Sequence, residues 1–107
     1  MMFFHEVGSS AADNQVIFEV TVRTEQMMYW ELGSAAGAMD VFVSGTGIDY
    51  QATALALIDL GSTAPSTAVV ETTAGGNYGI KSRWKKIKVL QKGATAVTGA
   101  YLIGWDE

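Results

Sequence analysis

The clearest pattern along the chain is an alternation of apolar and polar residues that begins near Gln15. Over residues 15–24 two sets of side chains alternate: Val16, Phe18, Val20 and Val22 against Ile17, Glu19, Thr21 and Arg23. Successive side chains of a strand point to opposite faces. The pattern therefore predicts a β-strand whose first set of side chains faces a core.

Further strands are predicted at intervals of about ten residues, separated by clusters of Gly, Ser, Asn or Asp. We expect them over residues 26–32, 39–44, 68–72, 83–91 and 94–105. Residues 50–60 fit either a strand or a helix that ends at Gly61, and the strand is favoured because every other segment is β. Residues 74–79 are predicted to be a flexible turn.

The last two predicted strands have the pattern of a hairpin. Lys92 and Gly93 would form its two-residue turn, with the glycine supplying a positive φ. In that register Trp84 faces Tyr101, which is a favourable cross-strand pair.

Together these elements predict an all-β, single-domain β-sandwich of jelly-roll or Greek-key type, with seven to eight strands. We expect residues 15–107 to form the sandwich and residues 1–14 to be an N-terminal arm and loop. The expected core residues are Phe18, Val20, Val41, Ile87 and Val89.

The composition agrees with one small globular domain. The chain has 107 residues, of which 49% are hydrophobic, and it has no cysteine. Disulfides and thiolate sites for zinc or iron–sulfur clusters are therefore excluded. The apolar run at residues 1–4 is short and no basic residue precedes it, so we expect no signal peptide and no membrane span, and synthesis in the cytoplasm.

Charge is distributed unevenly. Residues 1–80 hold nine acids and one base, whereas residues 81–107 hold six bases and two acids. This asymmetry indicates either charge pairing between strands or opposite patches through which copies or partners dock. The basic segment 81–92 is interpreted as a solvated strand beside the acidic first strand or as a docking surface for an acidic protein. Nucleic-acid contact ranks last, because the chain is acidic overall.

No catalytic pattern emerges from the titratable residues. His5, the single histidine, lies near the N-terminus, whereas a catalytic triad needs a rigidly held imidazole. Asp40, Asp49 and Asp59 lie near predicted strand ends, but their spacing selects neither a carboxylate pair nor a calcium loop. We assign no catalytic residue, metal ligand or cofactor.

The aromatic residues allow two interpretations. They are Trp30, Trp84 and Trp105 with Tyr29, Tyr50, Tyr78 and Tyr101. A core or subunit-interface role is favoured, and a sugar-stacking platform is the alternative.

Residues 43–50, 56–61, 78–81 and 84–101 resemble small structural proteins encoded in tailed-phage morphogenesis clusters, such as capsid cement (decoration) proteins. The resemblance rests on turn and strand signatures. It implies a β-sandwich virion protein and transfers no functional residue.

We therefore expect a non-enzymatic structural assembly protein of a phage virion, most simply a homo-oligomeric capsid cement protein, for example a trimer. Its partners would be itself and a major capsid or tail protein, with no membrane or nucleic acid involved. Contact residues are expected at Phe3 and Phe4 in the arm and at Lys85, Lys86 and Lys88. The alternative function is a carbohydrate- or receptor-binding β-sandwich module.

Overall fold

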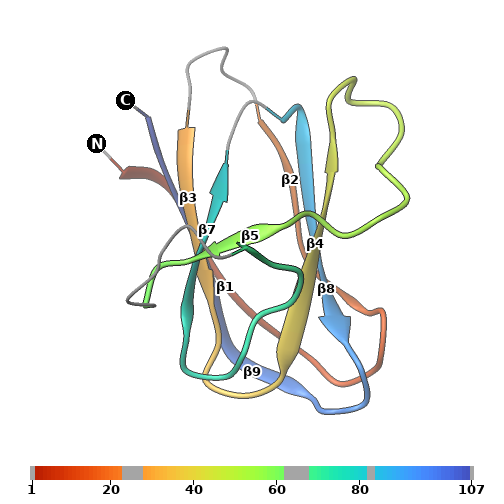
Figure 1. The fold of residues 1–107 in the computed structure, drawn as a ribbon, viewed down its shortest axis with the longest axis vertical. Coiled ribbons are helices and arrows are strands. Elements are labelled where there is room, and N and C mark those ends of the chain that lie inside the picture. Colours follow the sequence, from red (N-terminus) through yellow and green to blue (C-terminus); the bar gives the residue numbers. More distant parts are fainter. Residues whose placement is uncertain (1, 23–27, 62–67, 82–83, 107) are drawn as a thin grey trace.

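The structure, a computed structural model, describes residues 2–22, 28–61, 68–81 and 84–106. Within these ranges the chain forms nine strands. Figure 1 shows how the chain is arranged in space. They are β1 (Met2–Ser10), β2 (Val16–Thr21), β3 (Met28–Gly33), β4 (Ala38–Ser44), β5 (Leu57–Asp59), β6 (Ala68–Val69), β7 (Asn77–Lys81), β8 (Lys86–Lys92) and β9 (Val97–Asp106). The predicted all-β class is confirmed.

The strands form two antiparallel sheets that pack into a sandwich. The six-stranded sheet has the order β1-β9-β3-β7-β5-β6, and the three-stranded sheet has the order β2-β8-β4. The pairing is nested: β1 pairs with β9, β2 with β8 and β3 with β7. Consecutive strands from β1 to β5 also alternate between the two sheets. Nested pairing across two sheets is the jelly-roll arrangement, one of the two topologies that the sequence left open.

No helix in the described ranges is long and apolar enough to cross a membrane.

The core lies between the sheets and contains the five residues predicted for it. Phe18, Val20, Val41, Ile87 and Val89 are all at most 7% exposed. The alternation in β2 fails at one position, since Val16 is 46% exposed. A register shift between Val16 and Phe18 in the pairing with β8 interrupts the period of two and turns Val16 outward.

Residues 50–56 run beside β4 without forming a regular strand. The Gln51 N–H donates to the Val43 carbonyl at 2.9 Å, and the Leu55 N–H donates to the Val41 carbonyl at 2.7 Å. The strand predicted over residues 50–60 is therefore limited to β5, which pairs with β7 in the other sheet. The helix alternative is wrong, because this segment follows the edge of one sheet and then crosses to the other.

The assignment of residues 1–14 to an arm and loop is wrong for residues 2–10. These residues form β1, which pairs with β9 from Met2 to Ser10. The Ser10 hydroxyl donates to Gln91 Oε1 on β8 at 2.6 Å, a buried bond that ties β1 to the other sheet. Phe4 packs against the core, whereas Val7, which points to the opposite face, is 70% exposed. Apolar residues therefore lie on both faces of β1, and no period of two marks this strand in the sequence.

The predicted hairpin of the last two strands is also wrong. β8 lies between β2 and β4, whereas β9 lies between β1 and β3 in the other sheet. Gly93 has the expected positive φ, +90°, but the chain there passes between sheets. Trp84 precedes β8, and Tyr101 pairs instead with Val7 and Gly33. Each of these strands instead pairs with two strands that lie far from it in the sequence, β8 with β2 and β4 and β9 with β1 and β3.

Candidate functional site: a groove on the outer face of the six-stranded sheet

The outer face of the six-stranded sheet carries aromatic and aliphatic side chains. In β3, Trp30 and Leu32 are buried in the core, so the alternate residues Tyr29 and Glu31 face outward. Tyr29 pairs with Lys81 on β7 and with Trp105 on β9. Paired residues share a face of a sheet. The register therefore brings Tyr29, Lys81 and Trp105 into one row.

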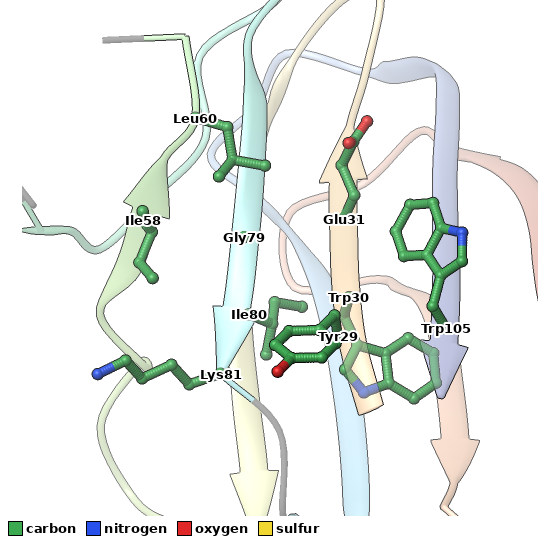
Figure 2. A pocket seen from close by; sticks show the side chains of 9 residues that line it. All are labelled: Tyr29, Trp30, Glu31, Ile58, Leu60, Gly79, Ile80, Lys81 and Trp105. Atoms are coloured by element: carbon green, nitrogen blue, oxygen red, sulfur yellow. The ribbon is translucent and has the colours of Figure 1, made fainter. Parts of the chain in front are cut away.

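A groove of about 520 Å³ is hollowed into this face. Figure 2 shows Gly79 of β7 at its centre, with Ile58 and Leu60 on one side and Tyr29 and Glu31 on the other. The complete lining is Tyr29, Trp30, Glu31, Ile58, Leu60, Gly79, Ile80, Lys81 and Trp105. We call it the outer groove. Its wall is mostly apolar, which is unusual for the outer face of an antiparallel sheet.

Gly79 keeps the floor of the outer groove open because it has no side chain. A Cβ at this position would lie 3.4 Å from Leu60 Cδ2 and 3.7 Å from Ile58 Cβ, which are ordinary van der Waals contacts. Ile58 is placed by its pairing with Gly79. Leu60 is placed by its N–H, which donates to the Asn77 carbonyl at 3.0 Å. A side chain at position 79 would therefore reduce the groove without breaking the sheet.

A charged group of each sign lies in the lining. The Tyr101 hydroxyl donates to Glu31 Oε2 at 2.7 Å and lies 2.7 Å from the side-chain amide of Asn77. Burial, and then the adjacent Glu31 carboxylate, raise the pKa of Tyr101 to about 12. No hydrogen bond among the described residues engages Glu31 Oε1. Lys81 at the end of β7 is exposed.

The predicted contact residues lie elsewhere and do not form one surface. Phe4 is partly buried and packs against the core, and the side chain of Phe3 lies outside the described part of the chain. Lys86 and Lys88 alternate with the buried Ile87 and Val89, so both face outward from the three-stranded sheet. Lys85 is exposed just before β8.

Lys88 lies over an aromatic ring that is itself bonded to Glu19 on β2. Its Nζ lies 4.3 Å from the centre of the Tyr50 ring. The Tyr50 hydroxyl donates to Glu19 Oε2 at 2.8 Å, and Glu19 pairs with Lys88 across β2 and β8. Burial, followed by the bond to Glu19 and its charge, raises the pKa of Tyr50 to about 12. β2 places one carboxylate, that of Glu19, beside β8, and the docking interpretation of the basic segment stays a prediction.

The titratable residues singled out in the sequence lie on separate elements. His5 is exposed on β1, Asp40 is buried on β4, Asp49 is exposed after β4, and Asp59 ends β5. Among the described residues no group of three or more His, Asp or Glu side chains could hold a metal ion.

Of the lining residues, the sequence analysis singled out the aromatic ones and Lys81, which begins the basic segment. Trp30 is a core residue, as expected, whereas Tyr29 and Trp105 contribute to an outward-facing groove. Gly79 was missed because residues 74–79 read as a turn, whereas β7 begins at Asn77. Tyr78, Gly79 and Ile80 are all buried, so no alternation of buried and exposed residues marks this strand.

Comparison with known proteins gives a likeness of fold. No protein-family model matches the chain, and no curated protein matches it in sequence. One solved structure, that of the SPBc2 prophage-derived protein YomS, is 12% identical to this chain. The match covers 97% of this chain and 94% of the YomS chain with a TM-score of 0.56. The two chains therefore share their fold over nearly the whole of both lengths.

Proposed function

We propose that this chain is a non-enzymatic structural assembly protein of a phage virion, acting as a homo-oligomeric capsid cement (decoration) protein. The observation that carries the proposal is the shared fold with a prophage-derived protein over 97% of this chain. A fold alone does not assign a function. Two further observations support the cement role. The strand and turn segments resemble those of phage cement proteins, and β1 forms an edge of the six-stranded sheet.

The edge of the six-stranded sheet supports self-association. β1 is the outermost strand on one side of that sheet. An edge strand presents backbone donors and acceptors to which another chain can add. Val7 on this strand is 70% exposed, and its partner across the pair is Tyr101. An edge of this kind with an exposed apolar side chain is a suitable contact for a second copy.

The oligomeric state tests this part of the proposal. We expect multi-angle light scattering to give a mass that is a multiple of the 11.4 kDa chain. Val7→Lys should shift the equilibrium toward the monomer, because it places a charge in the contact. Val70→Lys is the matched control, since Val70 is similarly exposed at 60% but lies after β6. A monomer at high concentration would contradict self-assembly.

Purified phage particles test the proposed role as a capsid cement protein. Mass spectrometry and immunogold labelling should detect the chain in purified particles of the phage whose genome encodes it. Particles without the chain should lose integrity on heating or at low ionic strength sooner than complete particles, because a cement protein bridges neighbouring capsid subunits. Absence of the chain from purified particles would refute the virion role.

A further inference from the structure

We propose that the outer groove is a carbohydrate-binding site, in which a saccharide packs its C–H face against Tyr29 and Trp105. This inference concerns a second activity and does not depend on assembly through β1. The inference is based on the side chains that line the groove and on the strand pairing that positions them.

The apolar part of the groove suits the face of a sugar ring. The C–H groups of a pyranose are weakly positive, and the face of an aromatic ring is negative. Tyr29 is 53% exposed, so its ring is presented to solvent beside the groove. Leu60 and Ile58 form the opposite wall, as Figure 2 shows. The volume of about 520 Å³ lies within the range of small-molecule sites, about 300–1,000 Å³.

The polar part of the groove suits hydroxyl groups. Glu31 Oε1 can accept from a sugar hydroxyl, and the Lys81 ammonium can donate to one. The bond from the Tyr101 hydroxyl to Glu31 Oε2 holds the carboxylate in place before a ligand arrives. A polar group held in its bound position loses less entropy on binding. A sugar has apolar faces and an edge of hydroxyls, and both have partners in the groove.

Other occupants fit this lining less well. A nucleic-acid strand would meet the Glu31 carboxylate on a chain whose net charge is −4. A quaternary ammonium group would meet the Lys81 cation, and the Trp30 ring is only 3% exposed and is not available to enclose it. An apolar segment of a second copy would take Glu31 and Lys81 out of water without giving them partners, which is costly.

Nuclear magnetic resonance tests the site directly. The ¹⁵N-labelled chain is titrated with the methyl glycosides of glucose, galactose, mannose and N-acetylglucosamine. We expect at least one of them to shift the amide signals of residues 29–31 and 79–81 and the indole signal of Trp105. Saturation transfer should reach the C–H protons of that sugar. Tyr29→Ala and Trp105→Ala should each weaken its binding about tenfold or more, through loss of the stacking face.

Three further variants complete the experiment. Gly79→Ala should weaken binding while preserving the folded spectrum, because a methyl group at position 79 enters the floor without a clash. Tyr50→Ala removes an aromatic ring that lies beside Lys88 of the three-stranded sheet, and it should leave sugar binding unchanged. Val7→Lys should also leave it unchanged, which separates this site from the assembly contact.

The proposal is overturned if none of these glycosides shifts the groove signals. It is equally overturned if the shifts persist in both Tyr29→Ala and Trp105→Ala, or if they occur on another face. Groove signals that move with protein concentration and not with sugar would identify a second copy of the chain as the occupant instead.

Discussion

Phe4 on β1 packs edge-on against Trp30 on β3, with the ring centroids 5.4 Å apart and the ring planes at 65°. The contact crosses β9, where Gly104 pairs with both residues. Edge-to-face aromatic pairs of this kind are worth about 0.5–1.5 kcal/mol beyond the area they bury. The N-terminal segment is thus part of the folded subunit, and Phe4 stabilises it from within.

We predict that Phe4→Ala lowers the free energy of unfolding by about 1–3 kcal/mol, less than for a fully buried phenylalanine because Phe4 is partly buried. Denaturant unfolding of the purified subunit measures this. His5→Ala on the same strand is the control, because His5 is exposed. Unchanged stability in Phe4→Ala, with loss of self-association, would restore the view of this segment as a docking arm.

The ring of Tyr101 lies over Gly33. A Cβ at position 33 would come within 2.7 Å of Tyr101 Cε1 and Oη and 2.8 Å of the Gly76 carbonyl oxygen, so both the Tyr101 ring and the backbone must shift. We predict that Gly33→Ala destabilises the fold by about 1–3 kcal/mol. If Tyr101 moves away from Glu31 into solvent, its pKa should fall from about 12 toward 10.

Unfolding curves and an ultraviolet titration of tyrosine ionisation check both effects of Gly33→Ala. Gly79→Ala serves as the control glycine in the same sheet, since a Cβ there makes only ordinary contacts. Equal stability of the two variants would show that Tyr101 adjusts without cost.

Asp40 is buried, with Oδ1 unbonded among the described residues. Burial raises the pKa of this carboxyl, and the Lys92 charge opposes the shift. Because the folded pKa lies above the unfolded value of 3.8, ionisation of Asp40 costs stability. That cost is absent below the unfolded pKa, grows as the pH rises through the folded pKa, and is full at neutral pH.

We therefore predict that Asp40→Asn is more stable than the natural chain at neutral pH, and that the difference shrinks as the pH falls toward 3.8. Thermal unfolding followed by circular dichroism over a pH series measures it. Asp49→Asn is the control, because Asp49 is exposed. A variant that is less stable at neutral pH would show that the attraction to Lys92 outweighs burial.

Lys85, just before β8, and Lys86 and Lys88 in β8 are predicted to help the chain dock on an acidic protein surface. A single exposed ion pair is worth only about 0–1 kcal/mol, so replacing one lysine should have little effect on docking. The test therefore uses the triple variant Lys85→Gln, Lys86→Gln, Lys88→Gln. It should slow association with the capsid or with other copies and reduce its salt dependence, since steering depends on the summed charge.

Association rates measured over a salt series test this steering. Lys81→Gln is the control, because Lys81 lies on the six-stranded sheet. Because Lys88 already faces Tyr50, most of the effect should come from Lys85 and Lys86. Rates that do not differ at low salt would leave these lysines as a solvated strand face, and loss of DNA binding in the triple variant would point to nucleic acid instead.

The sequence by itself determined the all-β class, the strands around Phe18 and Val41, and the inward set of their side chains. These features follow from the period of two in the directions of strand side chains, which is a local property of the backbone. A sequence shows this period wherever one face of a strand is buried and the other is exposed. It did not determine β1, which has the apolar residues Phe4 and Val7 on opposite faces, or the separation of β8 and β9 into different sheets.

Only the tertiary structure brought the outer groove together. Tyr29, Leu60, Gly79 and Trp105 are spread over much of the chain and meet because β3, the segment after β5, β7 and β9 are neighbours in space. Strand order is decided by which distant segments match in length, shape and apolar surface. No local spacing in the sequence encodes that choice, since each pairing depends on all the others that form the sandwich.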